Sequence, residues 1–493
     1  MALVHALQRL RARSKLAYVV TTVVVCLIVG GLGGAYVAFL TPLWAVALAA
    51  GAVGGLLMLR SREFTFLVIV AIILLLPFGS LPLNIGFSPT FLNLALGVLF
   101  FIWAARAARG LQEPWVSSPL SPAVLVFLLL TLAAFLAGLG HAHLTATSLR
   151  KFAEIPLGIA IYFAVLNLVR TRGEAERLTR WIILGATAAA ALGIVLYFLP
   201  QNLAIRLLSA LRIFRYPAGP DVLRFVEDNP ELPLRAISTS VDPNVLGAVL
   251  ILGMGLAAPH LFALRPILPR KLLAACLVVC GICLFLTYSR GSLVGLVAAL
   301  FLLGLVRYPR ALLVIVLAGT LVLLLPQAQG YVSHFVEGVQ GEDLATQMRF
   351  GEYKDALILI GRYPWLGVGF VDAPDIDLYL GVSNLYLLVA EEMGLVGLAA
   401  FLACLVTFYL VLLEGWKRSR TGERADGAVD SLEPLILGPG VAIAAGLVGG
   451  IFDHTLFSFP HALTFFWLIV GLGALAARLA DSPGSAEAAT VSA

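Results

Sequence analysis

Charged residues are scarce in this chain. Only 12% of its 493 residues are Asp, Glu, Lys or Arg, whereas 60% are hydrophobic. Ordinary soluble domains carry about 25% charged residues, so the composition excludes that class. Long apolar runs recur along nearly the whole sequence, and they predict an all-α, polytopic membrane helix bundle.

Cysteine is also sparse, and none of the five cysteines lies in a predicted loop. Because Cys26, Cys276, Cys280, Cys283 and Cys404 all fall within apolar runs, no disulfide framework is expected. Those at 276, 280 and 283 share one helical face. We interpret this face as a close-packing surface of small residues rather than as a set of metal ligands.

No small-residue cleavage site followed by a soluble domain comes after the basic N-terminus, MALVHALQRLRARSK. The run that begins at Leu16 is therefore expected to be a retained first helix and not a signal peptide. The apolar runs predict about fourteen transmembrane helices. Their approximate bounds are 16–40, 43–59, 64–78, 89–105, 122–139, 149–169, 181–199, 242–262, 271–288, 292–306, 311–326, 384–413, 435–456 and 460–479.

Basic residues indicate the orientation of the bundle. If both termini are cytoplasmic, every predicted inner segment carries Lys or Arg, as the positive-inside rule requires. The net charge of +5 then needs no nucleic-acid partner to explain it. The chain is expected to form a single integral membrane domain, 1–493, with a cytoplasmic tail at 480–493. Two long segments, 200–241 and 327–383, become periplasmic loops.

The remaining cations lie on the predicted outer side, where topology gives no reason for them. An outward-facing cationic basin at the membrane border suits an anionic lipid headgroup such as a diphosphate. For Arg206, Arg212 and Arg215 we favour contact with acidic lipid or solvent, because 202–216 has the pattern of a helix lying in the interface. The outer cations are Arg150, Lys151, Arg206, Arg212, Arg215, Arg224, Arg235, Arg290, Arg349, Lys354 and Arg362.

Arg290 stands out because it lies in LTYSRGSLVG, between two predicted spans. An arginine that faces hydrocarbon costs at least about 2.5 to 3.5 kcal/mol. Arg290 must therefore reach water, headgroups or an anionic partner, and the predicted topology places it on the outer side.

Two further outer stretches have a recognisable pattern. In LRAISTSVDPNVLG, Arg235 precedes a turn that opens a span, and Asp242 is expected to cap that helix. The stretch MRFGEYKDALILIGRYPWLGVG predicts a short helix stopped by Gly361 and Pro364. Arg349 is expected near its start, where the helix dipole favours a bound anion.

The next span opens with VSNLYLLVAEEMGLVGLAAFL. Asn384 and Glu391 are seven residues apart, so they share a helical face. An ionisable group about two turns into a membrane is a candidate functional residue. The alternative is that Glu391 is a protonated or hydrogen-bonded group that locks helix packing, and both interpretations stay open.

These stretches occur in an order and at a spacing that resemble the O-antigen ligase and O-antigen polymerase superfamily, with the likeness concentrated in residues 235–402. The resemblance implies a multi-pass glycosyltransferase of the bacterial inner membrane whose active site faces the periplasm. Its members move a glycan from undecaprenyl diphosphate to a sugar hydroxyl, either on a growing polysaccharide or on lipid A core. They use no nucleotide sugar.

The resemblance also implies roles for single residues. Arg235, Arg290 and Arg349 would hold the diphosphate, and preorganised guanidinium groups stabilise such a leaving group without a metal or another cofactor. Glu391 is the fourth catalytic candidate. The expected substrate-binding residues are Arg150, Lys151, Asn244, Tyr353, Ser383, Asn384 and His454.

Ser383 departs from the family pattern. Ligases and many polymerases of the family carry a histidine at this place, proposed to activate the acceptor hydroxyl, and an unassisted serine is no general base at neutral pH. The carboxylates in Asp375-Ile376-Asp377 have the spacing of metal-dependent glycosyltransferases, although a solvated loop explains them more simply. Candidate bases on the outer side are Asp372, Asp375, Asp377, His334, His454 and Glu391.

The first functional hypothesis is therefore a polymerase of lipid-linked glycan. A ligase is the second, because the histidine is absent, and the sequence does not separate the two. A solute transporter is the third, disfavoured because no clear pair of broken helices or inverted repeat is visible. The implied partners are the lipid-linked donor, a glycan or lipid A core acceptor, membrane lipids, and possible flippase and chain-length regulator proteins.

Overall fold

A computed structural model describes residue 23 and residues 42–81, 88–110, 114–324, 344–371, 381–426 and 432–480. The chain divides into two compact units, Met1–Ser61 and Arg62–Ala493. The described part of the first unit is almost entirely one helix. The second unit holds the other described helices and every candidate site residue that the structure describes.

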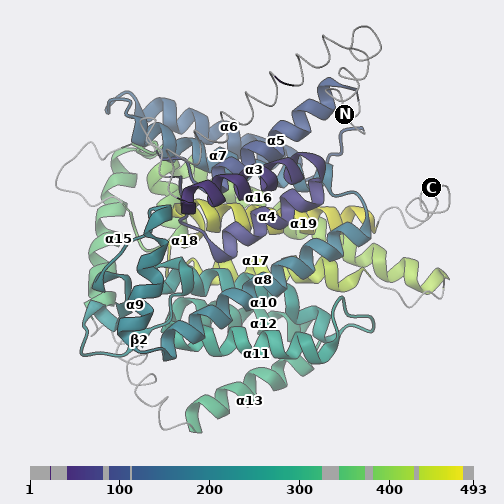
Figure 1. Ribbon diagram of the computed structural model, residues 1–493. Coiled ribbons are helices and arrows are strands. Elements are labelled where there is room, and N and C mark those ends of the chain that lie inside the picture. The colour runs from purple at the N-terminus through teal and green to yellow at the C-terminus, as the bar shows by residue number, and fades with distance from the viewer. Residues whose placement is uncertain are drawn as a thin grey trace. The chain divides into compact units, whose positions relative to one another are not determined.

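Helices make up nearly all of the regular structure in the described ranges, which confirms the predicted all-α membrane bundle. The two strands are only two residues long each. In chain order the helices and strands are α3 (Pro42–Arg60), α4 (Arg62–Leu75), α5 (Phe91–Ala108), α6 (Ser121–Gly138), α7 (Ala146–Leu168), α8 (Arg172–Phe198), α9 (Gln201–Ala210), β1 (Arg224–Phe225), β2 (Leu234–Arg235), α10 (Pro243–Phe262), α11 (Arg270–Leu286), α12 (Arg290–Val306), α13 (Arg310–Leu324), α15 (Leu344–Arg362), α16 (Leu385–Asp426), α17 (Glu433–Gly449), α18 (Thr455–Ser458) and α19 (Pro460–Leu479) (Figure 1).

The predicted spans can be compared with these helices one by one. Every predicted span from 43–59 onward coincides with a helix, whereas the first, 16–40, lies almost wholly outside the described residues. Within the described ranges, seven helices are long and apolar enough to cross a membrane: α5, α6, α7, α8, α10, α16 and α19. The chain is thus a multi-pass membrane protein. The full count of fourteen spans and the cytoplasmic termini stay predictions.

Helices α10 and α19 form the interior of the bundle, because 89% of each candidate span is buried. Helix α10 packs against α8, α11, α12 and α17, and these run side by side in Figure 1. Contact is backbone to backbone at two glycines. A Cβ at Gly255 of α10 would lie 2.5 Å from Ala442 Cα of α17, and one at Gly295 of α12 would overlap the Ala445 carbonyl oxygen of α17. Small residues at such contacts let membrane helices approach closely.

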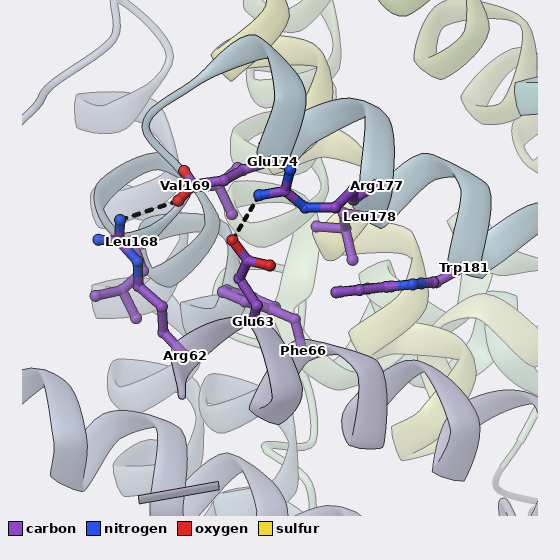
Figure 2. A pocket seen from close by; sticks show the side chains of 9 residues that line it. All are labelled: Arg62, Glu63, Phe66, Leu168, Val169, Glu174, Arg177, Leu178 and Trp181. Atoms are coloured by element: carbon purple, nitrogen blue, oxygen red, sulfur yellow. Dashed lines mark hydrogen bonds and ion pairs between the residues drawn. The ribbon is translucent and has the colours of Figure 1, made fainter. Parts of the chain in front are cut away.

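Paired charges join the starts of α4 and α8 (Figure 2). Arg62 lies 3.0 Å from Glu174, and Arg177 lies 2.5 Å from Glu63. The second Glu174 oxygen accepts from the backbone N–H groups of Arg170 and Thr171, so it also caps α8. These side chains leave a space of only ≈ 10 Å³. These ion pairs therefore hold α4 and α8 together at the predicted inner side and leave no room for a ligand.

Helix α16 is broken at Gly394, whose φ of 69° and ψ of −178° are not helical. Backbone groups of residues 364–369, which precede α16, form hydrogen bonds with the backbone groups near the break. Leu395 N–H donates to the Pro364 carbonyl at 2.7 Å, and Val368 N–H donates to the Glu391 carbonyl at 2.8 Å. Irregular backbone at membrane depth is tolerated where protein satisfies it in this way. The predicted span 384–413 is thus two helical segments, a break that the sequence reasoning missed.

The outer segment before α10 also contains regular structure. In the β1–β2 pair, Arg224 is opposite Arg235 in an antiparallel register. Helix α9 buries Ala204 and Leu208 but leaves Leu203 43% and Leu207 50% exposed. Exposed leucines on one face agree with the predicted helix in the membrane interface.

The topology can be tested with two introduced cysteines. Met348 on α15 is 61% exposed, and Lys417 near the end of α16 is exposed as well. We expect Met348→Cys to react with a membrane-impermeant maleimide in intact spheroplasts and Lys417→Cys to react only after lysis. The native cysteines at 276, 280, 283 and 404 are buried and should stay silent. The opposite labelling pattern would reverse the assignment of every outer residue.

Candidate functional site

Arg235 is held in place by two directed contacts. Its Nε donates to the Thr287 carbonyl at 2.8 Å, and one terminal nitrogen donates to Asn244 Oδ1 at 2.7 Å. The backbone adds a third link, because Ala236 N–H donates to the Leu286 carbonyl at 2.8 Å. The structure therefore brings Arg235 next to the turn that leads to Arg290, as well as to Asn244.

Asp242 caps α10, which confirms the predicted helix start. Its Oδ1 accepts from Asn244 N–H at 2.7 Å and from Val245 N–H at 3.1 Å. Burial raises the pKa of Asp242 above its ordinary value, these backbone bonds and Arg235 oppose the rise, and the carboxylate of Asp453 adds to it. Asp242, Arg235 and Asp453 are thus electrostatic neighbours.

Arg290 begins α12 and is half-buried. The next residue, Gly291, packs so closely that a Cβ there would lie 2.8 Å from Phe452 Cβ. On the opposite side, a Cβ at Gly247 of α10 would lie 2.7 Å from Ser292 Oγ. The start of α12 is therefore wedged between the start of α10 and the loop after α17.

Arg349 lies on α15 in the turn before Tyr353. The described helix begins already at Leu344, so Arg349 lies beyond the first turn. The prediction that the helix dipole favours an anion at Arg349 is therefore wrong, because this effect is confined to the first turn. The Tyr353 hydroxyl is 3.4 Å from the carbonyl oxygens of Ser383 and Ile451. Burial raises the pKa of Tyr353, Arg349 opposes that rise, and the carboxylates of neighbouring acidic residues add to it.

The residues before α16 connect α15 with the loop after α17. Asn384 Nδ2 donates to the Ile451 carbonyl at 2.9 Å, while its Oδ1 accepts from two backbone N–H groups and caps α16. Ser383 makes its contacts through the backbone: its N–H donates to Glu352 Oε2 at 2.8 Å, and its carbonyl faces Tyr353. Glu352 is a neighbour that sequence reasoning did not single out.

The loop of residues 450–453 lies next to a neighbour of each of the three arginines. Asp453 interacts electrostatically with Asp242 and with Tyr353, Phe452 faces the start of α12, and Ile451 accepts from Asn384. Sequence reasoning missed Asp453 as a site residue, although an acid at a helix end before Thr455 was visible. We call the group the arginine cluster. It consists of Arg235, Arg290, Arg349, Asn244, Tyr353, Asn384 and Asp453.

The two glutamates of α16 have different surroundings. Glu391 is 1% exposed, and its Oε1 accepts from Gly381 N–H at 3.2 Å, while its Oε2 has no partner among the described residues. Glu392 is half-buried, and its Oε2 accepts from Phe370 N–H at 2.8 Å. Glu391 therefore faces the loop before α16, whereas Glu392 faces a separate cavity.

That cavity, of ≈ 260 Å³, lies between α7, α16, α18 and α19, and we call it the acidic cavity. Lys151 and Glu154 from α7 and Glu392 from α16 line it, so Lys151 contributes here instead of to the arginine cluster. Arg150 precedes Lys151 on the same helix. His454 is half-buried and stacks on Phe459, with ring centroids 6.2 Å apart. Sequence reasoning missed Glu154 and Glu392.

Part of the predicted site lies outside the described residues, namely the candidate bases Asp372, Asp375, Asp377 and His334. Their roles stay predictions. Among the residues that the structure does describe, no group of three or more His, Cys, Asp or Glu side chains is arranged to hold a metal ion.

A multi-pass helical membrane protein with a cluster of arginines at one end of its bundle is the class that these observations define. Residues 275–402 match the family model described as O-antigen ligase. This match confirms the resemblance to the O-antigen ligase and polymerase superfamily over those residues, which include Arg290, Arg349, Ser383, Asn384 and Glu391. It supports a membrane glycosyltransferase of this type. No curated protein matches the chain.

Proposed function

We propose that the protein moves a glycan from undecaprenyl diphosphate to a sugar hydroxyl at the periplasmic face of the bacterial inner membrane. In this proposal it polymerises repeat units of O-antigen, capsule or exopolysaccharide. One observation carries the proposal: each of three arginines from distant parts of the chain has a close neighbour that interacts with or packs on the loop of residues 450–453. Such an arrangement suits a ligand with several negative charges.

The arginine cluster fits the charge changes of this reaction. The acceptor oxygen forms a bond to the anomeric carbon of the donor sugar, while the bond from that carbon to the diphosphate oxygen breaks. The electron pair leaves with the diphosphate, so negative charge grows next to the guanidinium groups. Preorganised cations stabilise such charge without reorganisation at the moment of reaction. Arg235 meets this condition well, because two hydrogen bonds already fix its plane.

The acceptor hydroxyl must also lose its proton. Ser383 is poorly suited to receive it, because its observed contacts are made by its backbone and a hydroxyl is a weak base. Asp453, Glu352 and Glu391 are acids described in this region. Asp242 lies there as well, but its carboxylate caps α10. In this proposal one of the first three carboxylates takes the proton as the acceptor O–H bond breaks, so that no positive charge builds up on the acceptor oxygen.

The lipid tail of the donor needs an apolar path, and a groove of ≈ 210 Å³ offers one. It runs between α12, α16 and α17 and is lined by residues such as Leu302, Leu412 and Val441. Helix α12 begins at Arg290 and reaches this groove about 18 Å further along its axis, given a rise of about 1.5 Å per residue. We propose that the polyprenyl tail lies there while its diphosphate rests on the arginine cluster.

Gene deletion separates the proposal from its alternatives. Loss of the long-chain glycan ladder would support a polymerase, because no repeat units would be joined. Accumulation of lipid-linked polymer that is not attached to lipid A core would indicate the ligase. A change in solute uptake with normal glycan would indicate a transporter and contradict the proposal. Neighbouring genes for a flippase and a chain-length regulator would further favour the polymerase.

Metal removal gives a second test. If arginines hold the diphosphate, the purified protein with a lipid-linked donor should keep its transfer activity in EDTA. The measurement is the rate of glycan transfer before and after chelation. A loss of activity that Mg²⁺ or Mn²⁺ restores would revive the carboxylates Asp375 and Asp377 as metal ligands.

A further inference from the structure

The acidic cavity lies beside the arginine cluster but is separate from it. Two short stretches of chain connect them. Gly381 lines the cavity, and Asn384 belongs to the cluster; Ser458 lines the cavity, and Asp453 belongs to the cluster. A molecule in the cavity would therefore contact residues that are close in sequence to residues of the arginine cluster.

Three charged side chains reach into the cavity from two helices. Lys151 is exposed, and Glu154, about one turn deeper on α7, is 8% exposed. Asn93 Nδ2 donates to Glu154 Oε1 at 2.9 Å, and Phe370 N–H donates to Glu392 Oε2 at 2.8 Å. Among the described residues, each carboxylate thus accepts one hydrogen bond through one oxygen, and its other oxygen can accept from a ligand.

Apart from Ser458, the rest of the lining is apolar and partly aromatic. Phe370 and Phe457 both contribute, with ring centroids 6.2 Å apart, and Leu388 and Leu463 add aliphatic surface. Apolar walls with a few convergent polar groups are typical of small-molecule sites. The volume of ≈ 260 Å³ equals about nine water molecules at about 30 Å³ each, which is room for one sugar unit.

We propose that the acidic cavity binds the terminal sugar of the acceptor, with the Glu154 and Glu392 carboxylates accepting hydrogen bonds from its hydroxyl groups. The faces of the sugar ring pack on the phenylalanines. Because the cavity holds two carboxylates and one lysine, it selects neutral or amino sugars over sugars that carry a carboxylate. This inference rests on the proposed function and adds to it the place and the charge class of the acceptor.

The test uses the purified full-length protein in lipid nanodiscs, with the lipid-linked repeat unit from its host as donor. Glu392→Gln keeps an acceptor for Phe370 N–H but removes the charge, whereas Leu388→Trp fills the cavity. The matched controls lie on the same helix: Glu414→Gln at an exposed ion pair and Leu402→Trp at a position 41% exposed. Undecaprenyl diphosphate serves as a separate probe of donor binding.

We expect Glu392→Gln to raise the KM for an acceptor with a neutral terminal sugar by about tenfold or more, since charge-assisted hydrogen bonds are lost. Leu388→Trp should abolish transfer. Both should bind undecaprenyl diphosphate like the wild type, and both controls should behave as the wild type. An unchanged acceptor KM in both cavity variants, or a preference for carboxylate-bearing sugars, would overturn the inference alone. A wild-type protein that neither binds undecaprenyl diphosphate nor transfers glycan would instead overturn the proposed function.

Discussion

Arg349→Lys should remove most glycan transfer although it keeps the positive charge. A guanidinium makes two parallel charge-assisted hydrogen bonds to a diphosphate in a fixed plane, and a lysine ammonium does not reproduce them. Loss of one preorganised electrostatic donor costs on the order of 100-fold to 1000-fold in rate. The measurement is glycan chain length in a deletion strain that carries the variant at matched membrane abundance.

Two further variants show whether the effect is specific to Arg349. Arg362→Lys lies on the same helix in an exposed last turn and should change little. Ser383→Ala should retain activity within about tenfold, because the observed contacts of Ser383 are made by its backbone, and a neutral hydrogen bond contributes only about 0.5 to 1.5 kcal/mol. An inactive Ser383→Ala beside an active Arg349→Lys would mean that the chemistry lies on other residues.

Gly369→Ala should destabilise the folded protein severely. The glycine has a φ of 84°, and an added Cβ would overlap the Ala134 carbonyl oxygen and lie 2.8 Å from Gly138 Cα. A strained backbone costs about 1 to 3 kcal/mol, and overpacking typically costs about 1 to 3 kcal/mol more. We expect a large loss of the monodisperse species in detergent and a clear drop in its melting temperature.

Gly351→Ala is the matched control for this change. Nothing lies within 4 Å of a Cβ built on Gly351, which is inside α15. Alanine is favoured over glycine in a helix by about 1 kcal/mol, so stability should be unchanged or slightly higher. Equal melting temperatures for the two variants would show that residues 363–371 are not packed against α6 and α16 as described.

The positions of the helices along the chain were largely predictable, because each predicted span is a local run of apolar residues. The cap at Asp242 was predictable for the same reason, since an Asp-Pro-Asn turn is a local signal. The break at Gly394 was not. Nothing local distinguishes that glycine from Gly397 three residues later; its φ of 69° is set by residues 363–371, which lie beside it only in the folded chain.

The candidate site was predictable only in part. Motif order identified the three arginines, but the loop of residues 450–453 near them comes a hundred residues or more later in the chain and has no matching pattern. Glu392 shows the same limit. The sequence reasoning chose Glu391 because it shares a face with Asn384, yet the neighbouring glutamate lines the cavity, because the break at Gly394 and the pairing with Phe370 decide which side each carboxylate faces.

The pairing of residues 363–371 with the broken helix also fixes one end of α15. Pro364, Val368 and Gly369 are tied to α16 by backbone hydrogen bonds directly after α15 ends. A tilt of α15 about this anchored end would have to break the hydrogen bond from Ser383 N–H to Glu352 Oε2, which holds α15 near Arg349. Arg349 lies about 20 Å from the anchored end along the helix axis, at about 1.5 Å per residue. A few degrees of tilt would carry its guanidinium by an ångström or more, while the wall that bears Glu392 stays still.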